Sequence, residues 1–178
     1  VDGETRPLSA PFLVLATQNP VELEGTFPLP EAQLDRFLLR LTLGYPNREE
    51  EREILRRFKT ADPFTKVNPI VAADAIISAS QTCRKVFVHP VLEDYLLDIV
   101  AATRSAEAIR LGSSPRATLA LYRTSQALAA INGRSYILPD DIQRLINPVL
   151  AHRLILNADA RLRGIAAPQL LDELLQDI

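Results

Sequence analysis

The feature that most constrains the fold of this chain is a change of pattern at Gly44-Tyr45-Pro46. Before this tripeptide, short apolar runs alternate with segments rich in proline and glycine, which is typical of buried strands joined by loops. After it, apolar residues recur at helical spacing, and capping residues separate one helical segment from the next. The sequence therefore predicts two domains, with strands in residues 1–43 and a helical bundle in residues 44–178.

In the first part, we expect strands over residues 12–16 and 38–43 and a short helix over 31–37. The run Phe-Leu-Val-Leu-Ala at 12–16 is apolar throughout, which indicates a strand buried on both faces. Such a strand needs neighbours, and the chain begins with Val1 rather than methionine, so we interpret it as a fragment. Without partner strands, this segment is expected to leave open edges and apolar faces.

The second part carries well-marked helix starts. Asn47 with Glu50 three residues on is a capping-box pattern, and Glu53 and Arg57 follow at i,i+4 spacing. Ser114 at the N-cap and Pro115 at the first position predict a helix that ends at Ile131. Further helices are expected over residues 72–85 and 90–108 and from Pro139 onward, with a last amphipathic turn near the C-terminus.

Composition excludes several classes of function. The 20 basic and 22 acidic residues give a net charge of −2, so no strong field attracts nucleic acid. No apolar run is long enough to span a membrane, and the polar N-terminus lacks the pattern of a signal peptide, so we expect a cytoplasmic protein. One cysteine excludes an intrachain disulfide, and with only two histidines we expect no metal site.

Four polar residues are candidates for a functional site. Asn19 follows the predicted strand 12–16, where an amide can orient a water or a phosphate oxygen, although Asn-Pro also simply starts turns. Arg116 falls in the first turn of its helix, where a cation opposes the helix dipole unless an anion binds there or the side chain reaches away. Arg36 and Arg40 are four residues apart beside Asp35, which also fits a surface salt-bridge cluster.

Four blocks of the sequence, in order, strongly resemble the MoxR family of AAA+ ATPases. They are Phe12-Leu-Val-Leu-Ala-Thr-Gln-Asn-Pro20, Glu24-Gly-Thr-Phe-Pro-Leu-Pro-Glu-Ala-Gln-Leu-Asp-Arg-Phe37, Tyr45-Pro-Asn-Arg-Glu-Glu-Glu51 and Gly112-Ser-Ser-Pro-Arg-Ala117. The resemblance covers residues 1 to about 157. It implies a mainly α chain, in which a helical AAA+ lid bundle (44–178) follows a truncated remnant of the α/β P-loop ATPase core (1–43).

The resemblance also implies roles for the candidate residues. Asn19 is similar to sensor 1, which holds the attacking water and the γ-phosphate. Arg36 is similar to the arginine finger, presented to the nucleotide of the adjacent subunit, with Arg40 as the reserve candidate. Arg116 is similar to sensor 2, which reaches from the lid to the phosphates.

The family's phosphate-binding motifs are the main departure from the resemblance. The chain holds no G-x-x-x-x-G-K-[ST] motif and no apolar strand ending in Asp-Glu. We therefore expect ATP and Mg²⁺ to serve the parent protein, while this fragment neither binds nor hydrolyses ATP. The parent is expected to be a ring, typically a hexamer, that acts as a chaperone or activator on von Willebrand A domain proteins or metalloenzymes.

Two other interpretations stay open at this point. The chain is alternatively a stand-alone helical module that binds a protein partner without nucleotide chemistry, in agreement with its missing P-loop. A magnesium-chelatase type of ATPase subunit shares the mechanism and differs in its client.

Overall fold

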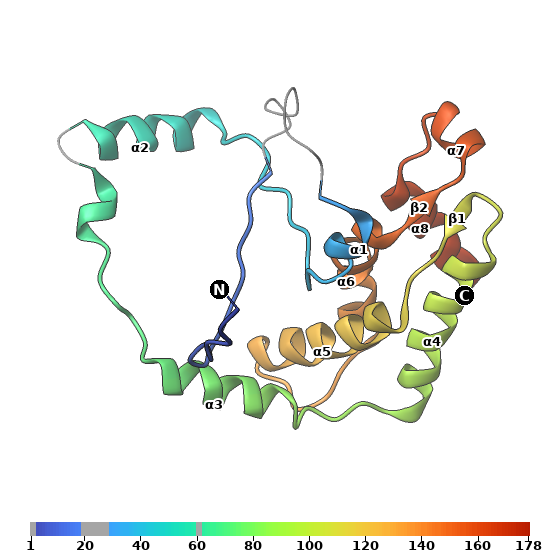
Figure 1. The fold of residues 1–178 in the computed structure, drawn as a ribbon, viewed down its shortest axis with the longest axis horizontal. Coiled ribbons are helices and arrows are strands. Elements are labelled where there is room, and N and C mark those ends of the chain that lie inside the picture. Colours follow the sequence, from blue (N-terminus) through green and yellow to red (C-terminus); the bar gives the residue numbers. More distant parts are fainter. Residues whose placement is uncertain (1–2, 19–28, 60–61) are drawn as a thin grey trace. The chain divides into compact units, whose positions relative to one another are not determined.

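The computed structural model describes residues 3–18, 29–59 and 62–178, and it is mainly α-helical, as predicted (Figure 1). The chain divides into two compact units. One unit comprises residues 1–12 and 41–78, and the other comprises residues 13–40 and 79–178.

The first unit contains α2 (Arg48–Phe58), the 3-10 turn η2 (Pro63–Lys66) and the beginning of α3 (Ala73–Cys83). The predicted capping box is confirmed, because the Asn47 side chain accepts hydrogen bonds from the N–H groups of Glu49 and Glu50. The Glu50 carboxylate in turn accepts from the Asn47 N–H at 2.7 Å. No residue of α2 is buried, so this helix depends on its cap and its exposed ion pairs, including Glu53–Arg57 at 3.1 Å.

The second unit is built around α4 (Pro90–Ser105), α5 (Pro115–Ile131) and α6 (Pro139–Leu150), which pack around one apolar core. The largest fully buried side chains of this core are Leu96, Leu121, Ile142, Ile146, Leu150 and Leu171. Helix α5 has the predicted bounds. The helix expected over 90–108 ends three residues earlier, because the chain turns there into a short strand.

Shorter elements surround the three helices. Strands β1 (Ile109–Leu111) and β2 (Ile155–Leu156) pair antiparallel, and α7 (Ala158–Leu162), α8 (Ala167–Leu174) and η4 (Leu175–Asp177) follow them. A second apolar cluster joins the sheet to α7 and α8. Helix α1 (Glu31–Leu34) packs against η3 (Ala151–Arg153), which continues from the end of α6 (Figure 1).

The two strands predicted before residue 44 are absent. Residues 12–16 and 38–43 make no ladder, and Phe12, Leu13, Val14 and Leu15 are each more than half exposed. A strand requires a neighbour for its N–H and C=O groups, and within the described ranges β1 and β2 form the only sheet. The expected helix over 31–37 is also shorter, because the chain turns at Asp35 and Arg36.

The end of β1 lies very close to the end of α4. A Cβ added at Gly112 would stand 2.5 Å from the Thr103 carbonyl oxygen and 2.8 Å from the Arg104 Cα, both backbone atoms. The Ser113 N–H donates to the Thr103 hydroxyl at 3.1 Å, and the Arg104 Nε donates to the Ser113 carbonyl at 2.9 Å. Glycine is therefore required for the connection that leads into α5.

We accordingly expect Gly112→Ala to destabilise the second unit by about 1–3 kcal/mol, as overpacking against backbone does. Urea denaturation followed by circular dichroism measures this loss. An unchanged transition midpoint would contradict the close approach of β1 to α4.

None of the helices in the described ranges is both long enough and apolar enough to cross a bilayer.

Candidate functional site

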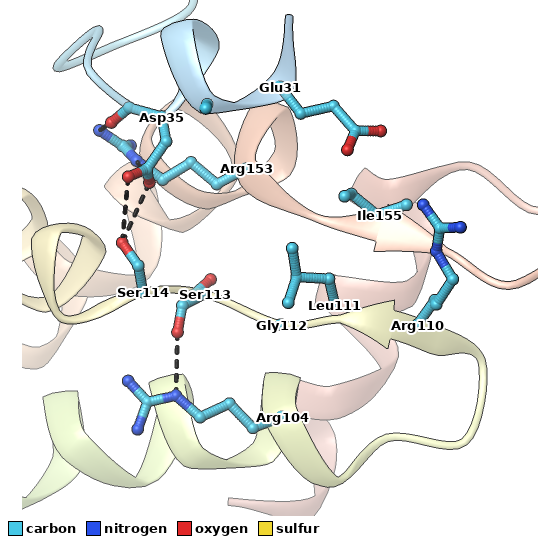
Figure 2. A pocket seen from close by; sticks show the side chains of 11 residues that line it. Glu31, Asp35, Arg104, Arg110, Leu111, Gly112, Ser113, Ser114, Arg153 and Ile155 are labelled. Atoms are coloured by element: carbon cyan, nitrogen blue, oxygen red, sulfur yellow. Dashed lines mark hydrogen bonds and ion pairs between the residues drawn. The ribbon is translucent and has the colours of Figure 1, made fainter.

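The site begins at the first residues of α5. Ser114 occupies the predicted N-cap position, but its side chain makes no capping bond. Its hydroxyl donates instead to the two carboxylate oxygens of Asp35, at 3.1 and 3.2 Å (Figure 2). Ser114 is therefore the N-cap residue by position, as predicted, and its hydroxyl is directed at Asp35 rather than at the helix N–H groups.

Asp35 is also paired with Arg153 at the end of η3. The Arg153 Nε lies 3.3 Å from Asp35 Oδ1, and the Arg153 side chain is only 2% exposed. The sequence places Asp35 beside Arg36 and Arg40, but among the described residues Asp35 forms an ion pair with neither of them. It connects the turn after α1 with both η3 and the start of α5.

Four arginines gather around a cavity of about 210 Å³ beside this pair: Arg36, Arg116, Arg123 and Arg153. Arg36 and Arg116 are exposed and belong to segments far apart in the sequence, yet both line the cavity. Across the described residues, neither arginine forms an ion pair, so the salt-bridge interpretation of Arg36 is not what the structure shows. Arg40 is exposed and is not among the lining residues; its N–H donates to the Pro148 carbonyl at 2.9 Å.

A larger cavity of about 590 Å³ shares Asp35 and Arg153 with the first one (Figure 2). Its lining includes Glu31 of α1, Arg110 of β1 and the segment that leads into α5. The buried Ser113 hydroxyl in this lining has no hydrogen-bond partner among the described residues. The Asp35–Arg153 pair is thus common to the walls of both cavities.

His152 also contacts the turn that follows α1. Its Nε2 lies 3.2 Å from the Phe37 carbonyl oxygen, and because a carbonyl only accepts, Nε2 carries the hydrogen. Burial lowers the pKa of His152, and the charge of Arg153 lowers this pKa further. The imidazole is therefore neutral at pH 7 and adds no charge to the arginine cluster.

The arrangement is suited to bind an anion with several charges. The cavity is lined by the guanidinium groups of Arg36, Arg116 and Arg123, which no described carboxylate neutralises. One guanidinium group can donate two parallel hydrogen bonds to two oxygens of a phosphate. In the described ranges, no group of three or more His, Cys, Asp or Glu side chains is placed to hold a metal ion. The residues present therefore fit an anion such as a phosphate group.

The structure brings together two of the four predicted site residues. Arg36 and Arg116 share the smaller cavity, Arg40 lies outside its lining, and Asn19 falls outside the described residues. The sequence analysis missed Arg123 and Arg153. Arg123 follows Arg116 by two helical turns, a spacing that places both on one face of α5. Arg153 follows His152 within a stretch that is apolar on both sides, 149–151 and 154–156, and a charge in such a stretch indicates a buried and paired side chain.

Sequence profiles of two families match the chain. The AAA lid domain matches residues 101–174, and the ATPase family associated with various cellular activities matches residues 1–39. The first match includes α5 with Arg116, and the second includes Arg36.

Similar proteins cover the whole chain. It is 41% identical to the uncharacterized protein YeaC of Bacillus subtilis and 40% identical to the chaperone MoxR1 of Mycobacterium tuberculosis. It covers 56% and 49% of these proteins, so the chain spans about half the length of the curated relatives it matches. A crystal structure of a candidate ATPase from Cytophaga hutchinsonii superposes with a TM-score of 0.91 at 40% identity, over 100% of this chain and 57% of that one. By its profile matches, its relatives and its fold, the chain belongs to the MoxR family of AAA+ ATPases.

Proposed function

We propose that this chain is the sensor and lid portion of a MoxR-like ATPase that couples ATP hydrolysis to chaperone-like assembly or activation of protein complexes or metalloenzymes. The observation that carries the proposal is the shared cavity of Arg36 and Arg116, two exposed cations without a carboxylate partner in the described ranges. Holding such charges together costs free energy through mutual repulsion, and a bound polyphosphate offsets that cost.

In this proposal, Arg36 acts as the arginine finger on the nucleotide of an adjacent subunit. Arg116 acts as sensor 2 and binds the phosphates from the lid helix, and Asn19 acts as sensor 1. Binding of ATP and Mg²⁺ also requires a P-loop lysine, the Ser/Thr residue beside it and an acidic base. The motifs that carry these residues do not occur in the 178 residues. The proposed division is an α/β core remnant at 1–43 and a lid at 44–178.

A site completed by a neighbouring subunit requires an oligomer. We propose a cytoplasmic homo-oligomeric ring, with six subunits as in the family's pattern, and a von Willebrand A domain protein or a metalloenzyme as its client. The family membership supports the ring, and the chaperone name of one relative supports a protein client in general.

The direct test compares Mg-ATP binding and turnover by these 178 residues with those of the protein extended upstream by a mononucleotide-binding half. We expect turnover in the extended protein alone, because the P-loop half supplies most of the phosphate contacts. Calorimetry and phosphate release measure the two properties.

Absence of turnover in both proteins would contradict the proposed function. The arginine cluster would then be inherited scaffold of a helical module that binds a protein partner. Tight Mg-ATP binding by the 178 residues alone would contradict the incompleteness of the site.

A further inference from the structure

Arg153 occupies an unusual place for an arginine. It ends η3, directly after the buried end of α6, and its side chain is 2% exposed. Burial lowers the pKa of Arg153, and the carboxylate of Asp35 opposes this effect. A buried guanidinium is costly unless all of its N–H groups have partners, so the contacts of Arg153 indicate what it is retained for.

These contacts are concentrated on one segment. The two terminal nitrogens donate to four carbonyl oxygens: Asp35 at 3.3 Å, Phe37 at 2.5 Å, Leu38 at 3.4 Å, and Val149. The Nε faces the Asp35 carboxylate at 3.3 Å as an ion pair but makes no hydrogen bond, so four of the five guanidinium N–H groups have carbonyl partners. The terminal nitrogens of Arg153 are therefore occupied by backbone carbonyls and its Nε faces Asp35, although Arg153 lines the cavity with Arg36 and Arg116.

Three of the four carbonyls belong to residues 35–38, the irregular segment that carries Arg36. Apart from α1, this segment has few bonds of its own. The N–H groups of Arg36 and Phe37 bond back to α1, the Phe37 carbonyl also accepts from His152, and the next backbone anchor is the bond from Arg40 N–H to the Pro148 carbonyl. Arg153 is thus the main polar attachment of the Arg36 backbone to the helical bundle.

The same network reaches Arg116. The Asp35 carboxylate that faces Arg153 also accepts the Ser114 hydroxyl, and Arg116 lies two residues further along α5. The chain Arg153–Asp35–Ser114 therefore connects η3, the turn after α1 and the first turn of α5 (Figure 2).

We propose that Arg153 is a positioning residue that fixes Arg36 and Arg116 relative to each other in the phosphate cavity, through its carbonyl contacts and through Asp35. This inference rests on the proposed function for its effect on catalysis, but its structural part is independent of ATP. Arg153 acts through the two cavity arginines and does not touch the nucleotide itself.

A matched control is available in the same unit. Arg134 forms a two-pronged ion pair with the buried Asp141, at 2.5 and 2.7 Å, and neither residue lines either cavity. Arg153→Met and Arg134→Met each remove one guanidinium from a pair while keeping an unbranched apolar side chain. Any effect that comes only from a loss of stability should therefore appear in both variants.

The structural part is tested by hydrogen exchange on the 178-residue chain. In Arg153→Met, we expect faster exchange at the N–H groups of Arg36, Phe37 and Arg40, with α6 still protected. In Arg134→Met, these three groups should exchange as in the unchanged chain. Equal behaviour of the two variants at these positions would overturn the proposal, whatever the protein does with ATP.

The catalytic part is tested in the extended protein by a double-mutant cycle on ATP turnover. Arg153→Met alone is expected to lower kcat/KM by about 10- to 100-fold, the scale of a small misplacement of catalytic groups. In an Arg36→Ala, Arg116→Ala background, the same change should have little further effect, because the groups it positions are gone. Arg153→Lys should restore part of the activity, and Arg134→Met should leave it unchanged.

Equal effects of Arg153→Met in both backgrounds would overturn the positioning role. If Arg36→Ala and Arg116→Ala themselves leave turnover unchanged, the proposed function fails and the hydrogen-exchange result stands separately. Should Arg153→Met not fold, Ser114→Ala tests the same network at its other end, where Ser114 is half-buried. It keeps Arg153 in place, and its loss of activity should again disappear when Arg116 is absent.

Discussion

Replacing Arg36 with alanine is expected to lower ATP turnover by about 10³-fold or more in the protein that carries the P-loop, the scale of a lost arginine finger. Charge spreads over the oxygens of the transferred phosphoryl group in the transition state, and a positioned guanidinium stabilises it. Arg36 is suited to this task because its backbone is held by the bundle, while its exposed side chain forms no ion pair with any described residue. Steady-state phosphate release at saturating ATP measures the effect.

Arg40→Ala is the matched comparison for this prediction. The side chain of Arg40 is exposed and outside the cavity lining, and its one anchoring bond is a backbone N–H that alanine retains. We expect turnover close to that of the unchanged protein. A severe loss in Arg40→Ala with a mild one in Arg36→Ala would move the finger assignment to Arg40.

Local signals in the sequence predicted the helical part of the fold well. The capping residues Asn47 and Glu50 and the Ser114-Pro115 pair marked helix starts correctly, because these signals lie within two or three residues of each helix start. The residue type of Arg116 near a helix start also pointed to an anion. Such features are complete within a short window of sequence.

The strands and the arginine network were not predictable in the same way. The apolar run at 12–16 indicates residues that favour burial, but a strand forms only where another strand offers its backbone groups. The meeting of Arg36 with Arg116, and of Asp35 with Arg153 and Ser114, joins residues that are far apart in the sequence. With a single sequence, residue types give the chemistry of such a site, whereas its partners follow only from the packing of α1, η3 and α5.

Replacing Arg116 with alanine is expected to weaken nucleotide binding to the extended protein by about 10- to 100-fold, since a hydrogen bond to a charged group is worth about 1.5–3 kcal/mol. Arg116 lies in the first turn of α5, where the Ser114 hydroxyl leaves the helix N–H groups without a side-chain cap, so an anion there also interacts with the helix end. Titration with a fluorescent ADP analogue measures the affinity. Arg110→Ala is the control, because Arg110 lines only the larger cavity; an equal loss in both variants would reflect general charge and contradict a specific role of Arg116.

The shared cavity makes a sharper prediction for mixed rings. Arg36 and Arg116 line one cavity, so in the proposed ring one subunit should offer both to the same phosphate chain, on the P-loop of its neighbour. Mixing Arg36→Ala subunits with Arg116→Ala subunits should then restore no activity, since every mixed interface lacks one arginine or the other. Mixing either variant with subunits that lack the P-loop lysine but keep both arginines should restore turnover at the interfaces where the arginine variant supplies the P-loop and the lysine-deficient subunit supplies both arginines. Recovery in the first mixture would show that the two arginines serve different nucleotides, and the cavity that they share would then not be a single phosphate site.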